Sequence, residues 1–312
     1  MAKSKNQYAA SQWMRVQARR GSAVEKRYYR PGTWMNSKEA IALGLTPSLV
    51  DDLVFNGGKL VPQMEFQNIY LGSGADWDAS DVANIDAASA LAMRDKRLNN
   101  VVMQYFPGAK LTCDPRSSLL LNDPAPKSLN EPDVQAQVIA LYDGGQIKKK
   151  DAGTTIFNLL LPPGSVLKLG SDTSLQGLGG YHGSVHFKRD GKRVTLYYSA
   201  NVFSEFLSSS KENGIVAFQQ PWKNVVATLY HEMNEFRTDP DVNDAITTGN
   251  DGFLGWMSGT GMEIGDQPIF EASSLSLVFK QVKTTNGKAT VPVQFLYSNA
   301  VHGAEGPIAK PH

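Results

Sequence analysis

A run of apolar residues in the middle of the chain, Thr154 to Leu161 (TTIFNLLL), most strongly constrains the fold. It starts with β-branched residues and ends at Pro162-Pro163-Gly164, where a strand cannot continue. A strand that is apolar on both faces is typical of the centre of a sheet covered on both sides. The run therefore predicts a buried central strand, with helices supplying the covering layers.

Apolar spacing predicts further elements around this strand. Met64 to Leu71 (MEFQNIYL) has the composition of another strand. A spacing of about 3.6 residues predicts helices over Ile85 to Met103 and over Asp133 to Tyr142. The turn dipeptides Asp190-Gly191 and Asn286-Gly287 each predict a β-hairpin.

The order of these elements predicts an α/β (α+β) fold with a mixed sheet and peripheral hairpins. Residues 1–60 are expected to form a basic N-terminal arm with short helices, and residues 61–270 the main domain. Residues 271–312 are expected to form a C-terminal hairpin and tail packed on that domain. The strands of this hairpin would be Ser274 to Val282 and Ala289 to Tyr297.

The composition excludes several classes of protein. A formal net charge of +1 gives no reason to expect nucleic acid as a partner. No apolar run approaches the roughly 18 residues of a membrane span. The single cysteine, Cys113, excludes an internal disulfide framework and a cysteine-based zinc site, and we expect a structural thiol there. Basic residues concentrate in the first thirty positions, where we expect a solvated arm, with phosphate or lipid binding as the alternative.

The clearest helix, Pro221 to Arg237, carries two stripes of side chains. The apolar stripe, which predicts a buried face, consists of Trp222, Val225, Val226, Leu229, Met233 and Phe236. The polar stripe consists of Thr228, His231, Glu232 and Glu235. Because His231 and Glu235 are one turn apart, their side chains lie about 5–6 Å apart and can reach one cation. Glu232 points slightly aside, where it can hold a metal-bound water.

The pattern His-Glu-x-x-Glu differs from the metalloprotease signature His-Glu-x-x-His in its second ligand. A carboxylate is an accepted zinc ligand, so the change does not forbid zinc. It makes the site harder and more anionic, which favours manganese or calcium more than a second imidazole would. The sequence therefore predicts a metal site for zinc, with manganese or calcium as alternatives.

A third ligand is expected from acidic residues that follow the helix. Glu263 is the first choice, with Asp266 accepting the other ring N–H of His231, and these two roles can be exchanged. Asp241 ranks lower, because Pro240 and Thr238 stand where metzincin helices turn. Turn chemistry among the neighbouring glycines is the alternative explanation for Glu263 and Asp266.

Several landmarks occur in an order that resembles the EXORDIUM-like, phosphate-induced protein family and its microbial relatives. They are Asn68-Ile69-Tyr70-Leu71 with Trp77, Leu161-Pro162-Pro163-Gly164, Gly180-Tyr181-His182-Gly183, His231-Glu232-x-x-Glu235-x-x-Thr238-Asp239-Pro240, Gly255-Trp256 and Glu263-Ile264-Gly265-Asp266. The resemblance spans about residues 64–266, and the Thr-Asp-Pro and Glu-Ile-Gly-Asp elements are its most specific part. It implies a secreted protein with a zincin-like fold and a metalloprotease site. The chain differs from extracellular members in its single cysteine and in showing no signal peptide, so its location stays open.

The resemblance also directs attention to Tyr181 and His182. It implies that His182 faces the metal, as an added ligand or as a donor to the developing oxyanion, a role that Tyr181 could share. The function expected from the sequence is a zinc-dependent hydrolase acting on a peptide or protein substrate, with Glu232 as the base. The alternative is a non-catalytic binding or structural protein on a zincin frame, because plant members often lack the His-Glu pair. The sequence does not indicate an oligomeric state.

Overall fold

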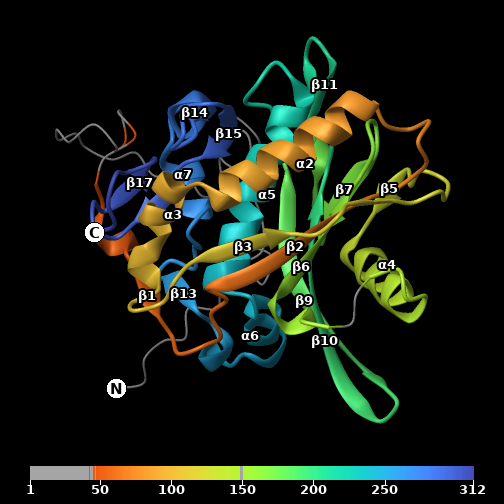
Figure 1. Cartoon of the computed structure of the whole chain (residues 1–312), viewed down its shortest axis with the longest axis horizontal. Coiled ribbons are helices and arrows are strands. Elements are labelled where there is room, and N and C mark those ends of the chain that lie inside the picture. The colour runs from red at the N-terminus through yellow and green to blue at the C-terminus, as the bar shows by residue number, and fades with distance from the viewer. Residues whose placement is uncertain (1–41, 43–44, 46, 148–149) are drawn as a thin grey trace.

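The computed structural model describes residues 42, 45, 47–147 and 150–312. Within these residues, a mixed sheet of six strands forms the centre of the molecule (Figure 1). Its strands run in the order β3 (Thr112–Pro115), β2 (Gln63–Tyr70), β6 (Thr155–Leu160), β10 (Lys192–Asn201) and β9 (Gly180–Arg189), and β4 (Leu119–Leu120) also pairs with β2. β6 lies between β2 and β10 and is parallel to both, which confirms the predicted central strand. β9 is antiparallel to β10 at the edge.

Alternate residues of β6 face two different cores, which explains why this strand is apolar on both sides. Ile156 and Leu160 belong to one cluster of buried side chains, and Phe157 and Leu159 belong to the other. Helices α2 (Ala79–Arg94), α3 (Lys96–Val102) and α5 (Pro221–Thr238) contribute to the first cluster, and α4 (Glu131–Asp143) to the second.

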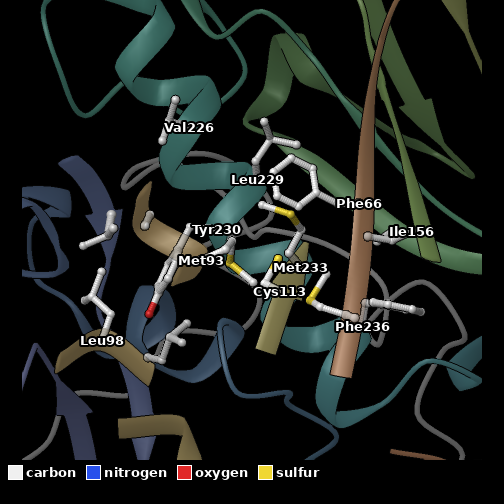
Figure 2. Close-up of a cluster of buried hydrophobic side chains, with 14 of the residues drawn as sticks. Phe66, Met93, Leu98, Cys113, Ile156, Val226, Leu229, Tyr230, Met233 and Phe236 are labelled. Atoms are coloured by element: carbon white, nitrogen blue, oxygen red, sulfur yellow. The ribbon is translucent and has the colours of Figure 1, made fainter. Parts of the chain in front are cut away.

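The apolar stripe of α5 packs against the sheet and α2, as its spacing predicts. Leu229, Met233 and Phe236 are fully buried among Phe66 and Ile156 (Figure 2). Burial continues around the helix, since every residue from 224 to 238 is buried. The polar stripe of α5 is therefore buried as well, so the polar groups of the site are surrounded by apolar side chains.

The predicted helix over Ile85 to Met103 is two helices in the structure. The side chain of Asp95 accepts hydrogen bonds from the backbone N–H groups of Arg97 and Leu98, so it caps the start of α3 and ends α2.

Cys113 of β3 is buried in the core to which α2, α3 and α5 contribute. Burial raises the pKa of its thiol to about 11, as expected of a structural cysteine.

Both predicted hairpins are present, with one difference. Asp190 and Gly191 take positive φ values of 50° and 74° at the turn between β9 and β10, as this turn dipeptide predicts. In the C-terminal hairpin, β14 (Phe279–Lys283) pairs with β15 (Thr290–Gln294), but Leu275–Val278 forms a short helix, α8, where a strand was predicted. Val291 and Val293 of β15 join the core beside α5.

The remaining elements are short. Two-stranded pairs are β1 (Leu53–Phe55) with β13 (Trp256–Ser258), β11 (Glu205–Ser208) with β12 (Lys211–Asn213), and β16 (Leu296–Ser298) with β17 (Gly303–Glu305). β5 (Ser128–Leu129), β7 (Val166–Leu169) and β8 (Asp172–Thr173) form a small sheet, and α6 (Val242–Thr248) and α7 (Asp266–Glu271) complete the helices. Single 3₁₀ turns occur at Leu49–Asp51, Met103–Tyr105, Ala152–Thr154, Ser174–Gln176 and Asp251–Phe253.

The basic cluster of the predicted N-terminal arm, up to Arg30, lies outside the described residues. No helix in the described part of the chain combines the length and apolar character needed to cross a membrane.

Candidate metal centre

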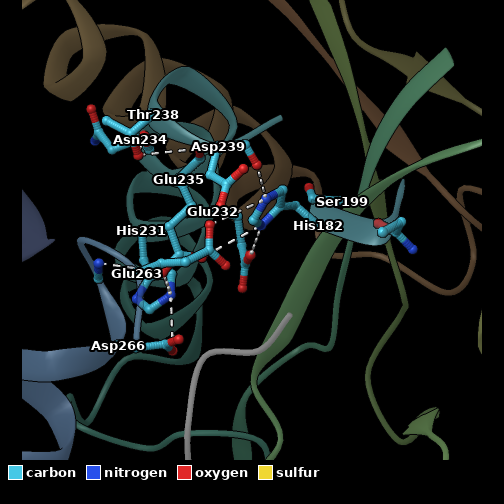
Figure 3. A network of polar contacts seen from close by, with 12 residues as sticks. His182, Ser199, His231, Glu232, Asn234, Glu235, Thr238, Asp239, Glu263 and Asp266 are labelled. Atoms are coloured by element: carbon cyan, nitrogen blue, oxygen red, sulfur yellow. Dashed lines mark hydrogen bonds and ion pairs between the residues drawn. The ribbon is translucent and has the colours of Figure 1, made fainter. Parts of the chain in front are cut away.

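The polar stripe of α5 meets β9 and the segment after β13 in a buried cluster of two imidazoles and five carboxylates (Figure 3). Each of these side chains is at most 1% exposed. They are His182, His231, Glu232, Glu235, Asp239, Glu263 and Asp266. Lone buried carboxylates are strongly disfavoured, so a cluster of this kind needs compensating cations or protons.

His231 turns one ring nitrogen outward and the other into the cluster. Its Nδ1 lies 2.8 Å from Oε1 of Gln294. The amide nitrogen of Gln294 donates to the carbonyl of Gly265, which fixes Oε1 as the atom that faces the ring. Nδ1 therefore donates to Gln294 whatever the charge of the ring, and Nε2 points inward. This Nε2 lies 2.9 Å from Oε1 of Glu235 and 3.8 Å from Oδ1 of Asp266, and it has no hydrogen-bond partner of good geometry.

His182 has the same arrangement with its nitrogens exchanged. Its Nε2 lies 3.1 Å from the backbone carbonyl oxygen of Asp239, which can only accept, so Nε2 is the donor. Its Nδ1 faces the cluster, 3.3 Å from Oε2 of Glu232 and 3.5 Å from Oε2 of Glu235. Both histidines are thus anchored at one nitrogen on a carbonyl oxygen and present the other to carboxylates, as metal-binding histidines do.

Glu235 lies between the two histidines. Its Oε1 faces His231 and accepts the backbone N–H of Gly265 at 3.3 Å, whereas its Oε2 faces His182 and has no hydrogen-bond partner. Two sets of ligand atoms result, each with all atoms within 4.8 Å of one another. One set comprises His231, Glu235 and Asp266, and the other comprises His182, Glu232 and Glu235.

Other buried oxygen atoms in the cluster also lack hydrogen-bond partners. They are Oε1 of Glu232, Oδ2 of Asp239, and both carboxylate oxygens of Glu263 and of Asp266. An unsatisfied buried polar group costs about 1–3 kcal/mol, and more if it is charged. Imidazole nitrogens and carboxylate oxygens, which are acceptors once deprotonated, fit a divalent cation such as zinc or manganese.

The pKa values show how strongly the cluster attracts positive charge. Burial lowers the pKa of both histidines, but the neighbouring carboxylates outweigh it and raise the pKa of His182 to about 10 and that of His231 to about 9. Burial raises the pKa of Glu263 and of Asp266 well above their ordinary values, and the charge of Glu235 raises them further. Protons and metal ions therefore compete for the same atoms.

No basic side chain of α5 neutralises these acids. The guanidinium of Arg237 is fully buried, but it points to the other side, where Nη1 donates to Oδ1 of Asn99 at 2.9 Å and Nε lies 3.0 Å from Sδ of Met64. In the described part of the chain, compensation for these carboxylates therefore comes from the two histidines, from protons on the carboxylates themselves or from bound cations.

A row of polar side chains crosses the sheet beneath α5 and ends at the cluster. Asn68, Asn158 and Ser199 are neighbours in register on β2, β6 and β10, and Ser199 is the partner of His182 on β9. Asn158 donates to Asn68 at 2.9 Å and accepts from Ser199 at 2.8 Å. The single asparagine in the apolar run TTIFNLLL therefore belongs to the floor of the site.

Two glycines among the sequence landmarks allow close approach in the site. A Cβ atom at Gly265 would lie 2.4 Å from Nδ1 of His231, so only glycine lets this segment pack on the imidazole ring. A Cβ atom at Gly255 would lie 1.9 Å from the carbonyl oxygen of Thr238, and the N–H of Gly255 donates to Asp239 at 2.9 Å. The landmarks Thr238-Asp239-Pro240, Gly255-Trp256 and Glu263-Ile264-Gly265-Asp266 thus meet at one place.

The structure brings together most, but not all, of the site residues predicted from the sequence. Asp266, rather than the first choice Glu263, lies in reach of Nε2 of His231, and Glu263 instead lies 3.7 Å from Nε2 of His182. The partner of Nδ1 of His231 is Gln294, where Asp266 was the expected acceptor. The difference arises because α7 begins at Asp266 and directs its carboxylate to the inner edge of the ring.

Tyr181 and Asp241 lie away from the cluster. Side chains alternate along a strand, so Tyr181 faces the opposite side of the sheet from His182 and packs edge-on against Tyr198, with ring centroids 6.4 Å apart. Asp241 accepts a hydrogen bond of 2.8 Å from the hydroxyl of Tyr197.

Gln294 was not predicted from the sequence as a site residue. The feature that could have indicated it is a polar residue at the end of the buried strand β15.

Comparisons with protein-family models, with curated proteins and with solved structures found no match to this chain. Function is therefore inferred from the contacts and charges of the cluster itself.

Proposed function

We propose that the protein is a zinc-dependent hydrolase of peptide bonds, with the metal held by His231, Glu235 and Asp266. The observation that carries the proposal is the inward Nε2 of His231, which faces carboxylate oxygens 2.9 and 3.8 Å away in a fully buried site. A lone pair and a carboxylate repel each other, so a metal ion or a proton must lie between this nitrogen and the carboxylates. With two carboxylates in the set, manganese and calcium are the competing ions.

Glu232 is the residue assigned to the chemistry. A bound zinc ion would lower the pKa of a water ligand to about 7. Oε2 of Glu232 is held near His182, and its buried Oε1 has no hydrogen-bond partner, so this oxygen can accept a proton from such a water. Burial raises the pKa of Glu232 above its ordinary value, which makes it a stronger base than an exposed glutamate.

The zincin-like fold and the EXORDIUM-like family are part of the same proposal. Two features support them: a helix that carries the ligands packs against a mixed sheet, and three of the family's landmark segments converge on the cluster. His182, from a fourth landmark, lies in the cluster as well.

A second candidate function is favoured by the burial of the site. All seven side chains are at most 1% exposed, a property that closed structural metal sites share. Under this alternative the ion stabilises the fold, and the protein acts by binding rather than by catalysis.

Cleavage of a peptide library by the zinc-loaded protein separates the two functions. The hydrolase account predicts cleavage by the wild type and a loss of at least about 100-fold in Glu232→Gln, since general-base catalysis contributes on this scale. Glu205→Gln, a glutamate of β11 outside the cluster, is the matched control and should cleave normally. If neither the wild type nor Glu232→Gln cleaves any peptide while zinc is bound to both, the hydrolase function is rejected and the binding function is supported.

A further inference from the structure

The residues on the β9 side of the cluster form a second set of ligand atoms that the zinc position does not use. Nδ1 of His182 lies 3.3 Å from Oε2 of Glu232 and 3.5 Å from Oε2 of Glu235. The bond from Nε2 of His182 to the carbonyl of Asp239 keeps Nδ1 directed inward. An inward ring nitrogen that faces carboxylate oxygens is also what marks the proposed zinc position at His231.

Glu235 connects the two positions. It directs Oε1 to His231 and Oε2 to His182, so each oxygen serves a different histidine. A carboxylate divided in this way is a common bridge between two metal ions about 3.5–4 Å apart. Oε2 of Glu235 is buried without a hydrogen-bond partner, which independently indicates that this side of the cluster binds a ligand.

The charge of the cluster can accommodate two divalent ions. Five carboxylates are buried in the cluster, and Arg237 points away from them. Once fully ionised, these five carboxylates carry a charge of −5, so two divalent ions bring the cluster close to neutrality.

We propose that the cluster is a dinuclear centre in which His182, Glu232 and Glu235 bind a second divalent cation, with Glu235 bridging the two ions. The inference rests on the proposed zinc position, with which it shares Glu235. Oε2 of Glu232 is the ligand, and Oε1 stays free to accept a proton. Glu263 lies at the other edge of the His182 ring, 3.7 Å from Nε2, and is not a ligand of this ion.

Metal stoichiometry tests the proposal without reference to activity. Wild-type protein is dialysed to equilibrium against Mn²⁺ or Zn²⁺, and bound metal is measured by mass spectrometry. The expected result is two equivalents for the wild type, one for His182→Ala and two for the control His186→Ala, whose imidazole pairs with Asp244 at 2.8 Å outside the cluster. One equivalent in the wild type, unchanged in His182→Ala, would overturn the second position and leave the zinc position intact. No bound metal in the wild type would overturn both.

A spectroscopic measurement on the wild type removes any dependence on how the variants fold. Two Mn²⁺ ions bridged by Glu235 should couple magnetically, so the six-line electron paramagnetic resonance signal of isolated Mn²⁺ should broaden into an exchange-coupled spectrum as the second equivalent binds. An uncoupled six-line signal that doubles in intensity would show two independent ions and would overturn the bridge.

Discussion

The side-chain oxygen of Gln294 lies 2.8 Å from Nδ1 of His231 and accepts a hydrogen bond from this ring nitrogen. Gln294 comes from β15, 63 positions after His231 in the chain. Its amide nitrogen is bound to the carbonyl of Gly265, so its orientation is determined by the same segment that packs on the imidazole. In the proposed metal site, Gln294 would therefore position a ligand without touching the ion.

Replacing Gln294 by leucine should weaken metal binding. The N–H of Nδ1 would lose its acceptor and the ring would lose its fixed tautomer, and such changes cost roughly 10- to 100-fold in metal affinity. Competition with a chromogenic chelator measures the Kd for zinc. Gln281→Leu, on the exposed side of β14, is the matched control. Equal Kd values for Gln294→Leu and wild type would contradict the assigned role.

Replacing Gly265 by alanine should displace the imidazole. The added Cβ atom would lie 2.4 Å from Nδ1 of His231, so the ring or the segment must move. We expect a loss of stability of about 1–3 kcal/mol, as for other overpacked sites, together with weaker zinc binding. Gly259→Ala serves as the control, since its Cβ atom would meet nothing within 4 Å. Denaturant unfolding with and without zinc checks both effects, and similar results for the two variants would count against this packing.

Metal should stabilise the fold. A ligand that binds only the native state at 100 times its Kd adds about 2.7 kcal/mol to the free energy of unfolding. Thermal unfolding should therefore shift to higher temperature with zinc and to lower temperature with a chelator. Glu235→Ala should abolish the shift, and Glu205→Gln should retain it. A zinc-induced shift of full size in Glu235→Ala would be inconsistent with the assigned ligands.

Glu271, outside the cluster, should make stability depend on pH. Burial, with a further contribution from Asp51, raises its pKa from 4.5 to about 7. The native state therefore holds this proton more tightly than the unfolded state, and stability should fall as pH rises from about 4.5 to about 7. Glu271→Gln removes this penalty, so the variant should gain about 1–3 kcal/mol over wild type at pH 8 and almost nothing at pH 4. Denaturant unfolding at both pH values, in the presence of a chelator, measures the difference. A gain of the same size at both pH values would refute the titration of Glu271 as its cause.

The sequence allowed prediction of those parts of the site that lie close together in the chain. The helical spacing of His231 and Glu235 is a local property, and so is the burial of the run that became β6. His182 was indicated only by a resemblance, because β9 reaches α5 through tertiary packing that spacing does not encode. The choice between Glu263 and Asp266 depended on where α7 begins, and the tautomer of His231 depended on a strand at the far end of the chain. The break between α2 and α3 was missed because Asp95 caps a helix within an otherwise continuous apolar pattern.

Anomalous diffraction from crystals grown with zinc, recorded above and below its absorption edge, tests the central claim most directly. The account predicts an anomalous peak within about 2.0–2.2 Å of Nε2 of His231 and of carboxylate oxygens of Glu235 and Asp266. A zinc-containing crystal with no anomalous peak among these three side chains would contradict it.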